Sequence, residues 1–193
     1  MSPRECLDHF NRLSAYTDLC RRMTDEPILN KVAASGILTL DLEELYPAGE
    51  RVVFDLKPLL WQEIALKEDE LRAFCKQHDW SQYTDKFVRI HCSVDAIIPT
   101  WAFMLITTHL QPYAAFVTQG SADDLERTVF TRLVHALDVA PYRGARVVVK
   151  GCSKLPVPIN AYVELSAKLL PVVKSLMFGE PCSTVPLYKA PKT

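Results

Sequence analysis

Residues 86–120 decide the fold class, and they read KFVRIHCSVDAIIPTWAFMLITTHLQPYAAFVTQG. Residues 87–92 form an apolar, β-rich run that predicts a strand, and residues 113–117 predict a second one. Between them, residues 99–110 predict a helix whose proline lies in the first turn, where its missing N–H costs nothing. A strand, a helix and a strand in this order predict two parallel strands joined by a right-handed crossover.

The same alternation continues toward the carboxyl terminus. Ser121 caps a predicted helix that runs to about residue 137, and residues 145–150 predict a further strand. Residues 160–178 predict a last helix, which Gly179 stops. We therefore expect a βαβαβα order in the C-terminal two thirds of the chain.

An antiparallel hairpin is expected near the N-terminus. The β-rich runs 37–42 and 51–56 flank a turn at residues 46–49, and we expect the two runs to pair. Together with the alternation downstream, this predicts an α/β fold with a layered, mainly parallel sheet.

The chain is expected to consist of one domain and a short extension. Residues 1–27 predict a helical N-terminal extension, because their apolar residues recur at helical spacing. Residues 28–193 are predicted to form a single α/β domain. The sequence shows no internal repeat.

Composition and charge exclude several classes of protein. The chain has 193 residues, of which 49% are hydrophobic and 23% charged, so it can bury a sizeable core. The balance of 22 Lys and Arg against 23 Asp and Glu argues against binding to nucleic acid or to a membrane surface. The most apolar window, residues 96–106, is shorter than the ~20 residues of a membrane span, and the opening residues do not predict a secretory signal. We expect a cytoplasmic protein.

Three Cys-Ser pairs are the main candidates for chemistry. Cys92, Cys152 and Cys182 are each followed by serine and, within seven residues, by proline. Cys92 and Cys152 follow predicted strands, and ligands bind at this edge of a parallel sheet. Because thiolates bind zinc and iron, the pattern predicts a three-cysteine site for zinc, iron or an iron-sulfur cluster. Candidates for a fourth ligand are His78, His91, Asp95 and Glu180.

One geometric objection applies to Cys182. A straight helix over residues 160–178 would leave Cys182 at the wrong end of the sheet. Pro171 would remove the objection if it broke this helix, and a homodimer would remove it by supplying Cys182 from a second chain. The other cysteines, at positions 6, 20 and 75, lie on helical patterns and are interpreted as structural.

Two other functional classes stay open, and so does the question of whether the protein is an enzyme. Cys92 could be the nucleophile of a thiol-dependent enzyme or a sulfur carrier, with His78 or His91 as the base. Alternatively, the cysteines belong to the core, as free cysteines often do, and the loops bind a protein partner. Polar and aromatic residues near element ends are further candidates for ligand binding: Asp79, Trp80, Asp95, Trp101 and Glu180.

Several stretches resemble a family whose function is unknown. They are residues 30–36, 49–55, 78–81, 92–101, 150–153 and 179–187, and all three Cys-Ser pairs lie among them. Over about residues 28–190 the chain resembles the bacterial domain-of-unknown-function family 2480. The family has no assigned activity, but its genes tend to lie beside the sulfur-mobilisation genes for iron-sulfur cluster assembly. The resemblance therefore implies iron-sulfur assembly proteins as partners.

Overall fold

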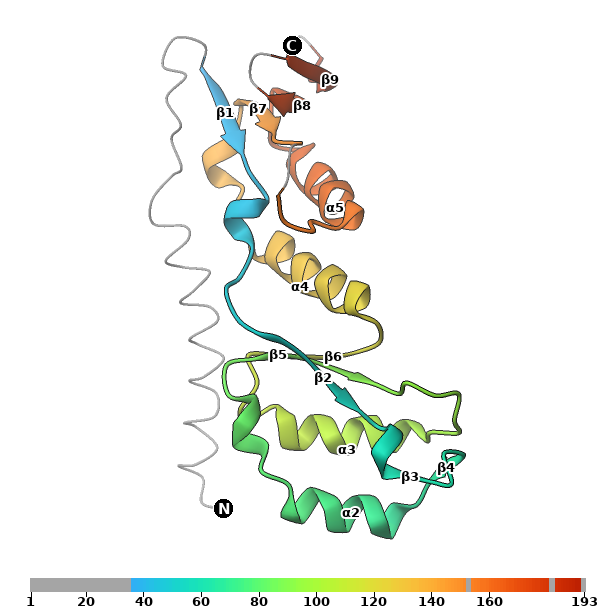
Figure 1. The fold of residues 1–193 in the computed structure, drawn as a ribbon. Helices are drawn as coiled ribbons and strands as arrows, with labels where there is room; N and C mark the ends of the chain where they lie inside the picture. The colour runs from blue at the N-terminus through green and yellow to red at the C-terminus, as the bar shows by residue number, and fades with distance from the viewer. Residues whose placement is uncertain (1–35, 152–153, 181–182, 192–193) are drawn as a thin grey trace. The chain divides into compact units, whose positions relative to one another are not determined.

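The computed structural model describes residues 36–151, 154–180 and 183–191 (Figure 1). The predicted extension over residues 1–27 lies outside the described residues. The chain divides into two compact units: unit 2 comprises residues 48–128, and unit 1 comprises the chain before and after it. The prediction of one domain over residues 28–193 stays a prediction, because compactness does not measure whether two units unfold together.

Unit 2 is built on a parallel three-stranded sheet. Its strands lie in the order β2-β5-β6, and α2 and α3 lie together on one side of it (Figure 1). The order of residues 86–120, strand, helix and strand, is confirmed. The elements are β2 (Arg51–Asp55), α2 (Glu68–Gln77), β5 (Phe87–His91), α3 (Thr100–Leu110) and β6 (Phe116–Gln119), with short 3₁₀ helices at Lys57–Leu59 and Trp80–Tyr83.

The alternation of side chains along β2 and β5 positions the core of unit 2. Phe54, Val88 and Ile90 point to the side of the two helices, where Ile106 and Leu71 meet them, and all five are buried. Their neighbours on the same strands, such as Asp55 and His91, point to the opposite face because successive strand residues alternate.

The antiparallel hairpin is present, but other residues form it. It consists of β3 (Leu60–Trp61) and β4 (Ala65–Leu66). The predicted pairing of runs 37–42 and 51–56 is wrong, because β1 (Ile37–Leu40) pairs in parallel with β7 and β2 pairs in parallel with β5. The proline and glycine at residues 46–49 correctly mark a break in the chain, but a turn signal does not say which strands pair across it.

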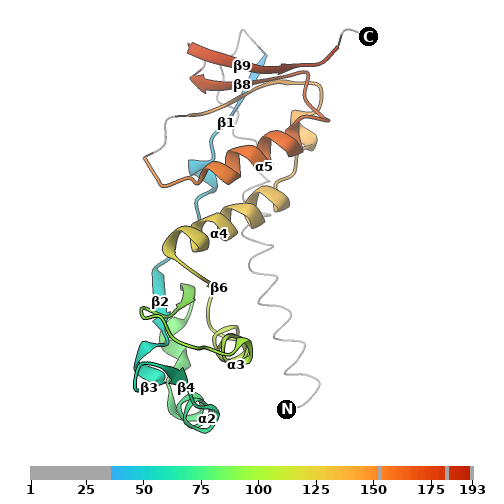
Figure 2. The ribbon, with the colours of Figure 1, turned by 90° about the vertical axis from the view of Figure 1, so that its right-hand side faces the viewer.

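Unit 1 is built on a four-stranded sheet in the order β1-β7-β8-β9. The first three strands are parallel, and β9 runs antiparallel to β8, beside which it lies in Figure 2. This confirms the α/β class with a mainly parallel sheet. The further elements are α4 (Ala122–Ala136), which crosses the boundary between the units, β7 (Arg146–Val149), α5 (Ile159–Leu169), β8 (Ser175–Glu180) and β9 (Ser183–Lys189), with 3₁₀ helices at Glu43–Leu45 and Ala140–Tyr142.

The predicted helix over residues 160–178 is too long. Helix α5 ends at Leu169, and residues 175–180 form strand β8. Pro171 explains the end of the helix: Leu170 still has helical backbone, but Pro171 has no N–H to donate to the carbonyl four residues earlier, and its ring would clash with that carbonyl. Gly179 is not a helix stop but a residue of β8, where its φ of 122° is accessible to glycine.

The two units repeat one βαβαβ topology, which corrects the expectation that the chain has no internal repeat. Phe87 begins the middle strand of unit 2, and Arg146, 59 positions later, begins that of unit 1. Pro99 and Pro158, also 59 positions apart, each precede a helix of 11 residues. The residues identical at this spacing are few and scattered, and for that reason the repeat is not evident in the sequence alone.

Local hydrogen bonds repeat at the same spacing. Asp79 accepts the N–H of Ser81, and Asp138 accepts the N–H of Ala140. Thr107 and Ser166 each donate their hydroxyl to the carbonyl four residues earlier in the helix. These contacts support the equivalence of the two units residue by residue.

Equivalent core substitutions test whether the units unfold together. Ile106 and Leu165 occupy equivalent positions and are both 0% exposed. Ile106→Ala and Leu165→Ala should each lower the free energy of unfolding by about 2–5 kcal/mol. All three tryptophans, at positions 61, 80 and 101, lie in unit 2, so tryptophan fluorescence follows that unit, whereas far-ultraviolet circular dichroism follows both.

If the two units form a single domain, urea unfolding followed by tryptophan fluorescence and by circular dichroism should have the same midpoint. Leu165→Ala, although it lies in unit 1, should then also shift the fluorescence transition of unit 2. A tryptophan transition unmoved by Leu165→Ala would contradict the prediction.

Candidate functional site

Cys92 lies directly after β5, at the carboxyl edge of the sheet of unit 2. Its side chain is partly buried and packs against the hydrophobic core of that unit. The next residue, Ser93, donates its backbone N–H to the carboxylate of Asp55 over 3.0 Å. The predicted position at a strand end is therefore correct, and a carboxylate from the neighbouring strand binds the backbone beside it.

Asp55 connects the ends of β2 and β5. Its Oδ1 accepts the N–H of Lys57 and the N–H of Ser93, both over 3.0 Å, and its register partner is His91. Burial acts to raise the pKa of Asp55, but the hydrogen bonds from Lys57 and Ser93, together with the charge of His91, bring this pKa below its ordinary value. The carboxylate is therefore ionised at neutral pH.

A related arrangement occupies the carboxyl edge of unit 1. Lys150, just after β7, pairs with Asp41 at 2.9 Å, and this hydrogen bond and charge raise the pKa of the lysine. Glu43 accepts the backbone N–H groups of Lys154 and Leu155. Carboxylates of the turn after β1 thus bind the chain on both sides of residues 151–153.

Cys152 and Cys182 lie outside the described residues, but the residues beside them are described. Val149 and Phe178 are register partners in the parallel strands β7 and β8. Gly151 lies against the ring of Phe178, so close that a Cβ at this glycine would clash with the ring. The geometric objection to Cys182 therefore falls, because a strand parallel to β7 leads to it instead of a long helix.

His78, Asp79 and Trp80 belong to an aromatic cluster of unit 2. Trp80 stacks between Phe54 and His109, with ring centroids at 5.5 and 5.1 Å. Its indole N–H donates to the carbonyl of Cys75 over 2.9 Å. Trp80 is thus a core residue that also caps the end of α2.

The imidazole of His78 forms hydrogen bonds with Gln82 and Tyr83, not with Cys92. His78 follows α2, before β5 begins, whereas Cys92 follows the end of β5. The amide nitrogen of Gln82 can only donate, so Nε2 of His78 accepts, which fits a neutral ring. Burial lowers the pKa of His78, and the neighbouring charge of Asp79 only partly opposes this.

The remaining predicted residues do not converge on one point within the described ranges. Asp95 is exposed in the loop before α3, and Trp101 is partly buried in the first turn of α3, against the core of unit 2. Glu180 ends β8 in unit 1. Across residues 36–151, 154–180 and 183–191, no group of three or more His, Cys, Asp or Glu side chains could hold a metal ion.

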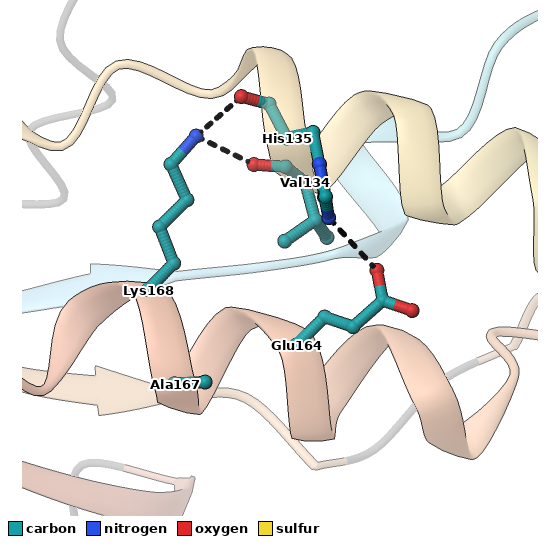
Figure 3. Close-up of a pocket in the computed structure, with 5 residues that line it drawn as sticks. All are labelled: Val134, His135, Glu164, Ala167 and Lys168. Atoms are coloured by element: carbon teal, nitrogen blue, oxygen red, sulfur yellow. Dashed lines mark hydrogen bonds and ion pairs between the residues drawn. The ribbon is translucent and has the colours of Figure 1, made fainter.

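A polar contact between α4 and α5 was not predicted from the sequence. Oε1 of Glu164 accepts hydrogen bonds from Thr131 and Asn160, and its other oxygen lies 3.8 Å from His135. Lys168 donates to the carbonyls of Val134 and His135, next to a shallow pocket of about 380 Å³ (Figure 3). Burial lowers the pKa of Lys168.

In unit 2, the positions equivalent to those of this polar contact carry other side chains. Glu164 and Lys168 are the equivalents of Leu105 and His109; Leu105 is partly buried against the core of unit 2, and His109 stacks on Trp80. Lys168 caps the carbonyl of Val134 as Trp80 caps that of Cys75. No sequence motif marks these residues, because their contacts join two helices that lie about 30 positions apart in the chain.

Fold and strand-end residues together define a class: an α/β protein of two repeated βαβαβ units with acidic residues at the carboxyl edge of each sheet. A family model described as a protein of unknown function, DUF2480, matches residues 26–190, and the chain belongs to this family. No curated protein and no solved structure matches the chain. Within the described residues, no helix is both long and apolar enough to cross a membrane.

The partly buried His78 predicts how stability depends on pH. Because the pKa of His78 is lower in the folded chain than its ordinary value of 6.5, the unfolded chain binds more protons as the pH falls through that value. Stability should therefore fall between pH 7 and pH 5, and His78→Gln should flatten this slope in urea unfolding. The control is Ile106→Ala, which removes buried apolar contacts in the same unit but no titratable group, so it should lower the stability and leave the slope as it is. Equal slopes in wild type and His78→Gln would refute the assignment.

Proposed function

We propose that the protein binds zinc or iron, as a single ion or as an iron-sulfur cluster, through the cysteines that follow its strand ends. The ligands would be Cys152 and Cys182, with Cys92 as the third predicted ligand. The binding would serve iron-sulfur cluster assembly or metal homeostasis, and the partners would be iron-sulfur assembly proteins. A homodimer stays a prediction.

The observation that carries the proposal is the parallel pairing of β7 and β8. Adjacent parallel strands leave a sheet at the same edge, about 5 Å apart. The chain approaches Cys152 from Gly151 and Cys182 from Glu180, and Gly151 already contacts Phe178 in the neighbouring strand. The chain thus leads toward both cysteines from adjacent strands, which supports the proposal because two ligands of one ion must lie close together.

The charges at this edge also support thiolate chemistry. Lys150 precedes Cys152 by two residues, and a nearby cation favours the thiolate form that binds metals. Asp41 and Glu180 supply carboxylate oxygens, which zinc and iron also accept.

Metal content tests the proposal directly. Protein purified without oxygen is assayed for zinc, iron and acid-labile sulfide, with an ultraviolet-visible spectrum, beside Cys92→Ser, Cys152→Ser and Cys182→Ser. We expect stoichiometric metal in wild type and its loss in Cys152→Ser and Cys182→Ser, since each removes a thiolate. Loss in Cys92→Ser as well would establish the three-cysteine set, and sulfide would distinguish a cluster from a single ion.

The matched controls are Cys6→Ser and Cys20→Ser, which lie outside the residues that the family model matches. Both should keep the metal. Folded wild type that takes up neither zinc nor iron on reconstitution would refute the proposal. So would full metal content in Cys152→Ser and Cys182→Ser. Either result would favour the thiol enzyme or the interaction module.

A further inference from the structure

We infer that Asp55 is a positioning residue for Cys92: its carboxylate holds the backbone that follows the cysteine and thereby sets how far the thiol is exposed. The inference rests on the proposed function only in one respect, the role of Cys92 as a metal ligand. The hydrogen bonds that carry it lie within unit 2 and involve no metal.

Two hydrogen bonds join the end of β2 to the chain on either side of Cys92, and Asp55 makes the second of them. On one side, Leu56 donates its N–H to the carbonyl of His91 over 2.8 Å, which joins β2 to the end of β5. On the other side, Oδ1 of Asp55 accepts the N–H of Ser93 over 3.0 Å. Cys92 lies between these two attachments, with its side chain on the core of unit 2.

The same oxygen accepts the N–H of Lys57, which begins the 3₁₀ turn after β2. Asp55 is therefore fixed by its own turn before it reaches across to Ser93. A carboxylate held in this way accepts a stronger hydrogen bond than a neutral group would, and it keeps the geometry of the neighbouring loop constant.

Unit 1 provides an independent parallel. Asp41 is the equivalent of Asp55, because β1 and β2 pair with equivalent strands in equivalent register. Its Oδ1 accepts the N–H of Glu43, two residues on, as Oδ1 of Asp55 accepts that of Lys57. The turn after β1 also binds the segment after β7, through Asp41 to Lys150 and through Glu43 to Leu155. Two different sets of side chains thus make the same type of connection.

Thiol alkylation tests the inference. The full-length protein, treated with a chelator, reacts with iodoacetamide under native conditions, and the rates at Cys92 and Cys75 are measured by mass spectrometry of peptides. Loss of a hydrogen bond to a charged acceptor should let the loop open more often, so Asp55→Ala should raise the rate at Cys92 about tenfold or more. Asp55→Asn keeps an acceptor oxygen and should stay closer to wild type.

Two controls separate positioning from general destabilisation. Cys75 is 3% exposed in the core of unit 2, and its rate should not change in either variant; a parallel rise would indicate unfolding. Asp124→Ala removes a comparable carboxylate hydrogen bond, to the N–H of Ser121, and should leave the rate at Cys92 unchanged. An unchanged rate at Cys92 in Asp55→Ala, or the same increase in Asp124→Ala, overturns the inference. Because the assay needs no metal, failure of the metal-binding proposal would leave this result standing.

Discussion

Parallel pairing between the first and the middle strand of each unit is the constraint on which the rest of the structure depends. β2 pairs with β5, and Ile37 of β1 pairs with Arg146 of β7 far along the chain. Parallel neighbours cannot be joined by a tight turn, so helices must cross between them, and these helices cover the sheet. Burial of the strands and the order of the elements both follow from this pairing.

The same pairing decides where the polar residues gather. Strands that run in parallel end at one edge, and each unit has an aspartate at that edge, Asp41 or Asp55, which binds the chain after the middle strand. The segments with the predicted cysteines follow these strand ends. Both the metal proposal and the positioning role of Asp55 depend on this shared edge rather than on a motif of adjacent residues.

The two units share one strand and helix topology but differ in the side chains that pack between their helices. In unit 2, Trp80 caps the end of α2 and stacks with His109, so the helix contact is apolar and aromatic. In unit 1, Lys168 caps the end of α4, and Glu164 accepts hydrogen bonds from its neighbours. The last carbonyl groups of a helix need hydrogen-bond donors, but different side chains can supply them. The two units can therefore share a topology although few of their residues are identical.

Local pattern was sufficient for part of the structure. Residues 86–120 determined β5, α3 and the position of Cys92 at a strand end, because periodicity and proline placement act between near neighbours in the chain. They also predicted a strand after α3, but over residues 113–117, whereas β6 comprises Phe116–Gln119. Tertiary structure decided the partners of residues 37–42 and 51–56, strand β8, the contact of Asp55 with Ser93 and the repeat itself. The physical reason is that strand pairing and capping depend on contacts between residues far apart in the sequence, which no local pattern specifies.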